Sequence, residues 1–141
     1  MIRSTLLAAV FAIGFSMAAS AASMQFQATM KGASEVPPTD STGTGDARAT
    51  LDTATRQLTY TVTFQGLTGP ATAAHFHGPA AAGANAGVVL PLGNKPTSPI
   101  HGTATLTEAQ VSDLEAGKWY VNVHTAKHPG GEIRGQMLAA H

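Results

Sequence analysis

The sequence contains no cysteine. This absence excludes a disulfide framework, thiolate chemistry, zinc knuckles and cysteine-ligated iron–sulfur clusters. A domain of this kind obtains its stability from packing and hydrogen bonds, with a bound ligand as one further source. Any metal ion would have to be held mainly by nitrogen or oxygen ligands.

Charged residues are also scarce. Asp, Glu, Lys and Arg make up 11% of the chain, with eight acidic and eight basic residues and a formal net charge of zero. No run of basic residues is present, which argues against nucleic acid or an anionic membrane surface as a partner. Charge gives no positive indication of what the protein binds.

The sequence has one long apolar run, from Leu6 to about Ala18. It follows Arg3 and leads into small residues over 19–23, which is typical of a secretory signal peptide. The run is too short for a comfortable transmembrane span of roughly 20 residues, and an uncleaved anchor is the alternative. We predict a signal peptide over residues 1–22, a mature domain over residues 23–141 without a membrane span, and a secreted or periplasmic location.

Motifs of several enzyme classes are missing as well. No Gly-x-Ser-x-Gly elbow supplies the nucleophile of a serine hydrolase of that class. The segment Thr42-Gly43-Thr44-Gly45 lacks the Lys-Ser/Thr pair of a phosphate-binding loop. Nothing in the sequence selects one pair of carboxylates for glycoside hydrolysis.

Alternation of apolar and polar residues dominates the mature region. Leu58, Tyr60 and Val62 alternate with threonines, for example, as in a half-buried strand. We expect further strands over 24–31, 46–52, 88–92, 100–106, 119–124 and 132–138, and around residues 75–77. The single expected helix begins after the N-cap Thr107 and ends near Gly117. These elements predict an all-β fold, an antiparallel Greek-key-like β-sandwich or small barrel with one short helix.

Two histidines share one face of a predicted strand. Because side chains alternate in an extended chain, His75 and His77 point the same way while Phe76 points to the opposite face. A third histidine, His124, lies in a second predicted strand. Imidazole suits copper, zinc and nickel, so these residues predict one copper-like ion, with zinc as the alternative. The competing interpretation is that the histidines only hold loop carbonyls.

Four further residues are candidates for the surroundings of this site. His128 lies in the turn that follows His124 and is a candidate additional ligand. Asn122 is two residues before His124, and the carboxylate of Glu132 could accept the second N–H of a ligand histidine. Glu132 and Arg134 share one face of the last predicted strand, so the simpler expectation for them is an ion pair.

Several blocks of the sequence resemble the CHRD domain, a module named after the animal protein chordin and also found in exported bacterial proteins. The blocks keep their order over nearly the whole mature chain, and they are Glu35-Val36-Pro37-Pro38, Ala74-His75-Phe76-His77-Gly78-Pro79, Leu114 to Gly117, Tyr120-Val121-Asn122-Val123-His124-Thr125 and Gly130-Gly131-Glu132-Ile133-Arg134-Gly135. The resemblance implies an extracytoplasmic all-β module without a settled biochemical activity. Chordin's antagonism of growth factors does not transfer with it, because function lies in sites and not in folds.

A weaker likeness concerns the pattern of histidines alone. His-x-His on one strand, a later histidine and an arginine near the end are similar to copper–zinc superoxide dismutases. That likeness implies His75, His77 and His124 as copper ligands and Arg134 as a guide for an anion. The zinc half of such a site has no evident counterpart in this sequence.

Three functions therefore follow from the sequence. The first is an exported module that binds one metal ion through His75, His77 and His124. The second is a structural or protein-interaction module of the cell envelope without a metal. The third is a copper-only, dismutase-like oxidoreductase, although catalysis is the less favoured expectation.

Overall fold

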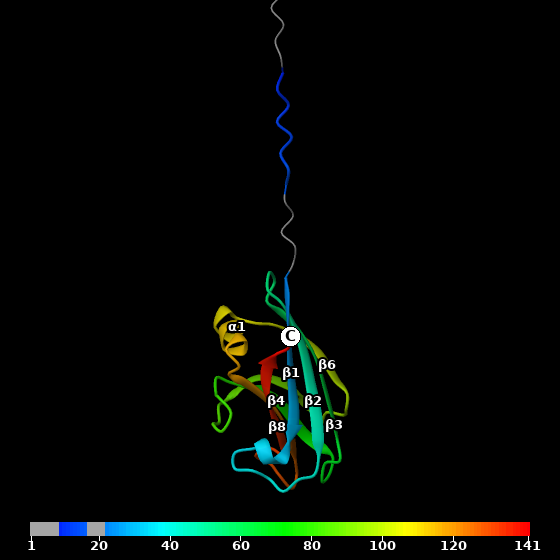
Figure 1. The fold of residues 1–141 in the computed structure, drawn as a ribbon. Coiled ribbons are helices and arrows are strands. Elements are labelled where there is room, and N and C mark those ends of the chain that lie inside the picture. The colour runs from blue at the N-terminus through cyan, green and yellow to red at the C-terminus, as the bar shows by residue number, and fades with distance from the viewer. Residues whose placement is uncertain (1–8, 17–21) are drawn as a thin grey trace, which may run out of the picture.

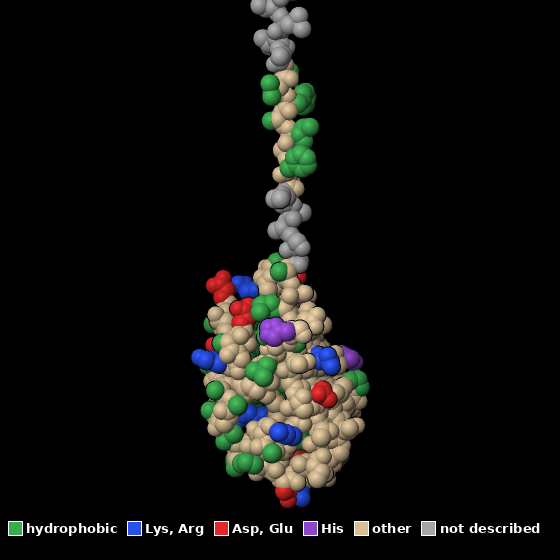
Figure 2. Space-filling view, in the orientation of Figure 1, with side chains coloured by type: hydrophobic (Ala, Val, Ile, Leu, Met, Phe, Trp, Pro, Cys, Tyr) green, Lys and Arg blue, Asp and Glu red, His purple; other side chains and the backbone are tan. Residues whose placement is uncertain are grey.

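The computed structural model describes residues 9–16 and 22–141. Residues 9–16 contain no helix or strand, and they lie apart from the folded domain with their apolar side chains exposed (Figures 1 and 2). The remainder of the predicted signal peptide, 1–8 and 17–21, lies outside the described residues, so this assignment stays a prediction. Among the described residues, no helix is long and apolar enough to cross a membrane.

Eight strands form one antiparallel sheet with the order β5-β4-β7-β8-β1-β2-β3-β6 (Figure 1). Their bounds are β1 Ser23–Lys31, β2 Thr44–Asp52, β3 Gln57–Gln65, β4 Ala71–His77, β5 Val88–Asn94, β6 Ile100–Thr105, β7 Trp119–Thr125 and β8 Ile133–Ala139. The predicted all-β antiparallel fold is confirmed. It differs in one respect from a sandwich of two separate sheets, because a single hydrogen-bonded sheet curls until it is nearly closed.

Three pairings join strands that are not consecutive in the chain. β1 pairs with β8, β3 pairs with β6, and β4 pairs with β7. The pairing of β4 with β7 returns the chain beside β4 after a long excursion through β5, β6 and the helix α1 (Glu108–Glu115), as in a Greek key. This crossover places the strand of His75 and His77 beside the strand of His124.

Apolar side chains from opposite sides of the curled sheet meet in one core. The ring of Tyr60 on β3 meets the ring of Phe76 on β4 edge to face at 5.5 Å, although these strands are far apart in the sheet order. Phe76 also packs against Trp119 at 5.7 Å. Aromatic pairs of this kind add to folding stability beyond the contribution of their buried area. They hold the Phe76 face of β4 against the core, so the opposite face, which carries His75 and His77, points outward.

The predicted helix is confirmed, and it ends at Glu115, slightly before the expected end near Gly117. The Thr107 hydroxyl accepts a hydrogen bond from the Gln110 backbone N–H at 3.1 Å, and the Gln110 side chain accepts one from the Thr107 N–H at 2.9 Å. This reciprocal capping box satisfies two backbone donors at the start of α1. Gly117 follows the helix with a φ of +72°, a left-handed conformation that favours glycine.

Candidate metal centre

The three predicted histidines come together on the outer face of the sheet. His75 and His77 point outward from β4, while Phe76 between them is fully buried in the core. The antiparallel register sets His75 opposite Asn122 and Ala73 opposite His124. Each imidazole offers one ring nitrogen to a group in which the nitrogens all lie within 4.8 Å of one another.

The shortest separation in this group joins His75 Nδ1 to His124 Nε2, at 3.0 Å. Imidazole nitrogens bind zinc or copper at about 2 Å, so nitrogens that share one ion lie roughly 3.3 Å apart in a tetrahedral site. The widest separation would therefore have to contract by about 1 to 1.5 Å. An ion shared by all three residues therefore requires a small rearrangement of rings that are half-buried at His75 and His124 and buried at His77.

Backbone carbonyls hold the other ring nitrogen of two histidines. His77 Nδ1 lies 3.0 Å from the Ala86 carbonyl oxygen, and His124 Nδ1 lies 2.9 Å from the Pro129 carbonyl oxygen. A carbonyl only accepts, so both Nδ1 atoms carry a hydrogen. In the neutral rings, the Nε2 atoms of His77 and His124 then keep their lone pairs, and both Nε2 atoms contact the side chain of Asn122.

The electrostatics favours neutral imidazoles. Burial is the main cause that lowers the pKa of His75, and the neighbouring imidazoles of His124 and His77 lower it further. Burial also lowers the pKa of His77, although its contacts with Ala86 and Asn122 oppose that effect. Neutral imidazole is the form that binds a metal ion.

Asn122 lies between the two lone pairs. Its side-chain atom assigned as Oδ1 is 3.0 Å from His77 Nε2 and 2.9 Å from His124 Nε2. The residue is buried, and it comes from β7, the strand that also carries His124. The structure thus places Asn122 in contact with two of the predicted ligands.

Arg134 is separated from His77 by the ring of Tyr120. The imidazole of His77 stacks on the ring of Tyr120 at 4.7 Å, and the Arg134 guanidinium lies over the same ring at 3.5 Å. Arg134 is 1% exposed and donates hydrogen bonds to the Ala84 carbonyl oxygen at 2.7 Å and to Asn85 Oδ1 at 3.0 Å. Its guanidinium has no access to an approaching anion, so the guiding role implied by the dismutase likeness does not fit. Arg134 instead holds the alanine-rich loop that covers the site.

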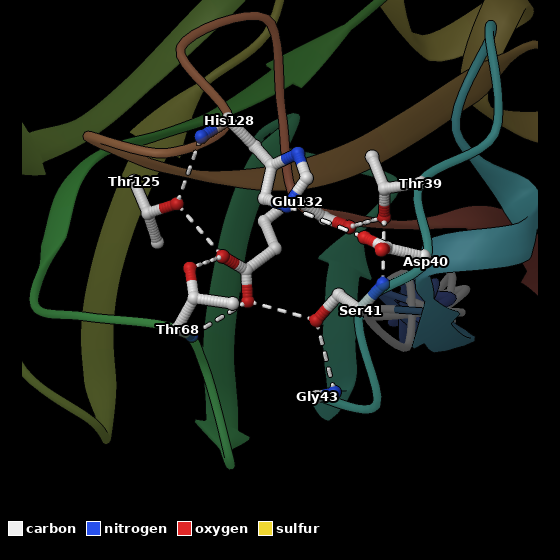
Figure 3. Close-up of polar contacts among 8 residues, drawn as sticks. All are labelled: Thr39, Asp40, Ser41, Gly43, Thr68, Thr125, His128 and Glu132. Atoms are coloured by element: carbon white, nitrogen blue, oxygen red, sulfur yellow. Dashed lines mark hydrogen bonds and ion pairs between the residues drawn. The ribbon is translucent and has the colours of Figure 1, made fainter.

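Glu132 contacts neither Arg134 nor a histidine of the cluster, and the expected ion pair is wrong. Its carboxylate accepts hydrogen bonds from the Thr68 hydroxyl and N–H, from Ser41 and from Thr125 (Figure 3). Burial alone would raise the pKa of this carboxyl, but these hydrogen bonds leave it below its usual value. Glu132 therefore fastens two loops to the end of β7 as an ionised group.

His128 belongs to this second network. Its backbone N–H donates to the Thr125 hydroxyl at 3.2 Å, and its Nε2 lies 3.9 Å from Asp40 Oδ1 (Figure 3). The group of nitrogens that could hold one ion contains His75, His77 and His124 without His128. The structure therefore separates this candidate ligand from the other three.

The loop over residues 80–87 directly follows the His75/His77 strand and forms part of the site wall, and its Ala86 carbonyl also accepts a hydrogen bond from the Tyr120 hydroxyl at 3.1 Å. Sequence reasoning missed one contributor to the site, Glu35, which is 5% exposed and lies beside the Asn122 amide. The sequence feature that could have indicated Glu35 is the Glu35-Val36-Pro37-Pro38 block, in which an acidic residue precedes a conformationally restricted proline pair.

The comparisons with known proteins give one match. The family model described as the CHRD domain matches residues 26–137, which include every strand in whole or in part and all three histidines of the cluster. No curated protein and no solved structure matches the sequence.

Proposed function

This chain belongs to the CHRD domain family, and from its histidine cluster we propose that it binds one transition-metal ion, copper or alternatively zinc. The ligands are His77 Nε2, His124 Nε2 and His75 Nδ1. One observation carries the proposal: two backbone carbonyls fix the hydrogens of His77 and His124 on Nδ1, which leaves a lone pair on each Nε2, and one nitrogen from each of the three rings lies within 4.8 Å of the others.

The competing role, in which the histidines only hold loops, uses part of the same geometry. The contacts with Ala86 and Pro129 do attach two loops to the sheet. Loop attachment, however, needs only the Nδ1 atoms. It does not account for the grouping of one further nitrogen from each of three rings within 4.8 Å. His75 Nδ1 lies 3.0 Å from His124 Nε2, so it can donate a hydrogen bond there in the metal-free protein, and a metal ion would take the place of that hydrogen.

The donor set favours borderline transition metals. Three imidazoles without a thiolate suit copper and zinc better than magnesium or calcium, which prefer oxygen ligands. Three protein ligands also leave a coordination position open, and His75 and His124 are only half-buried, whereas His77 is buried. The proposal includes a secreted or periplasmic location, and it assigns the protein metal binding without a catalytic turnover.

Metal titration of the purified protein tests the proposal. Copper and zinc are added against a competing chelator, and we expect saturation near one ion per chain. His77→Ala should lose at least tenfold in affinity because one of three ligands is gone. His101→Ala is the matched control, since His101 is exposed on β6 and contacts Thr61 instead of the cluster.

Two results would contradict the proposal. One is the absence of saturable uptake by the wild-type protein. The other is equal affinity of wild type and His77→Ala, which would move any bound ion to a different place on the molecule.

A further inference from the structure

A buried carboxyl group lies beside the Asn122 amide, which contacts the histidine cluster. Glu35 follows the 3₁₀ turn Gly32–Ser34 and is 5% exposed, and its Oε1 has no partner among the described residues. A side chain at Gly131 would collide with both Glu35 Oε1 and Asn122 Nδ2. Both atoms therefore lie beside the bare Cα of Gly131.

The orientation of the Asn122 amide is the feature that this carboxyl can control. With neutral His77 and His124, both Nε2 atoms are acceptors, so the amide must present its NH₂ group to them. The carbonyl oxygen of Asn122 then faces Glu35. The opposite orientation places the amide oxygen between the two histidines, where its negative end can face a cation, and it turns the NH₂ group toward Glu35. This second orientation is the one assigned to Asn122 in the structure.

We propose that Glu35 is a positioning residue of the metal centre, which holds the Asn122 amide and, through it, the convergent ring nitrogens of His77 and His124. The inference rests on the proposed function and adds to it a residue 87 positions away from Asn122 in the chain. Gly131, with a φ of +124°, is the space that lets the two side chains meet.

The surroundings of Glu35 suit this role. Burial raises its pKa to about 7, while the Arg134 guanidinium and the Asn122 amide oppose that effect. Asp40, Lys127 and His128 line the same pocket as Glu35. A carboxyl of this kind can donate to the amide oxygen when it is protonated and accept from the NH₂ group when it is ionised, so it matches both orientations of Asn122.

A double-mutant cycle on the purified protein tests the proposal with copper or zinc as the probe. Glu35→Leu keeps an apolar group of similar size but cannot form a hydrogen bond, and we expect roughly tenfold weaker metal binding. Asn122→Ala should weaken binding to a similar degree. If Glu35 acts through Asn122, the double variant binds no more weakly than Asn122→Ala alone, whereas independent effects would multiply to roughly a hundredfold.

Two further variants separate positioning from general damage. Glu35→Gln can still donate and accept, so it should retain an affinity close to that of the wild type. Glu132→Gln changes the other buried carboxyl, which lies in the separate network with Thr68 and Ser41, and should leave metal affinity unchanged. Multiplicative losses in the cycle, or no loss in Glu35→Leu, would overturn the proposal.

A readout without metal distinguishes this inference from the proposed function. Nitrogen-15 NMR of the metal-free protein reports which ring nitrogens carry hydrogen. We expect Glu35→Leu to shift the Nε2 resonances of His77 and His124 and to leave His101 unchanged. If the wild type binds no metal but these resonances move, the proposed function fails and the positioning role stands; unmoved resonances overturn the positioning role in either case.

Discussion

At the residue scale, backbone carbonyls decide what the histidines can do. Ala86 and Pro129 supply carbonyl oxygens that occupy one nitrogen of His77 and His124. The same contact that attaches a loop thus selects the tautomer that leaves a lone pair for a metal ion. Alanine and proline at these positions contribute only their backbone, so no side-chain motif in the sequence could reveal the selection.

Glu35 leads to a prediction about stability and pH. Its pKa is about 7 in the folded protein, against 4.5 for an exposed glutamate. As pH rises from 4.5 to 7, the unfolded chain loses this proton before the folded protein does, so folding stability falls. The cost is absent below pH 4.5, is complete above pH 7, and amounts to at most about 3 kcal/mol.

Glu35→Gln should therefore gain stability relative to the wild type at pH 8 by roughly 1 to 3 kcal/mol, compared with the difference at pH 4.5. Urea unfolding of the metal-free proteins at the two pH values measures this change. The comparison cancels the titration of the histidines, which both proteins share. A difference between the variants that does not depend on pH would show that Glu35 ionises normally.

Alternation along a strand predicted the histidine pair correctly but placed Glu132 wrongly. His75 and His77 lie inside β4, where the two-residue period holds. Glu132 precedes β8, which begins at Ile133, and it follows Gly131 with its φ of +124°. The period therefore does not extend to Glu132, and its carboxylate turns toward Thr68 instead of sharing a face with Arg134.

At the scale of elements, the capping box of α1 gives a local prediction. Thr107→Ala removes the acceptor for the Gln110 N–H, and it should cost about 1 kcal/mol of unfolding free energy. Ser112→Ala, in the exposed middle of the same helix, is the control and should change stability by less than about 0.5 kcal/mol. Chemical denaturation measures both values.

Metal affinity should be the same in Thr107→Ala as in the wild type, because α1 supplies no residue to the histidine cluster. An equal loss of stability in Ser112→Ala would contradict the capping interpretation. A loss of metal affinity in Thr107→Ala would show instead that the helix supports β7 at the site.

The existence of most elements could be predicted from the sequence, but their pairing could not. Local alternation marks β1 and β3, and the capping motif marks α1, because these patterns depend on neighbouring residues alone. The pairing of β4 with β7 depends on core contacts such as Phe76 with Trp119. Those contacts join segments separated by a long connection, and no local pattern encodes them.

At the scale of the whole molecule, polar groups form a second layer outside the apolar core. Tyr120, Asn122 and Arg134 project from the outer face of β7 and β8 and are buried under loops. Acidic and basic side chains on the face seen in Figure 2 are scattered without a patch of one sign. The distinctive chemistry of this molecule is thus concentrated beneath the loops that cover one part of the sheet.

The proposed metal site would couple metal binding to folding. His75 and His124, two of the proposed ligands, lie 3.0 Å apart in the fold but are 49 residues apart in the chain, so the unfolded chain does not present them together. An ion that binds only the folded protein stabilises it by about 2.7 kcal/mol when its free concentration is 100 times its dissociation constant. For a domain of this size, that corresponds to a rise of roughly 10 °C in melting temperature.

Thermal unfolding of the purified protein, followed by circular dichroism with and without saturating copper or zinc, measures this rise. A strong chelator should reverse it. His77→Ala should show no more than a small fraction of the shift, while His101→Ala should show all of it, because only the first change removes a ligand from the cluster. A shift of equal size in His77→Ala would mean that the stabilising ion binds elsewhere, and the link between the crossover of β4 onto β7 and metal binding would be broken.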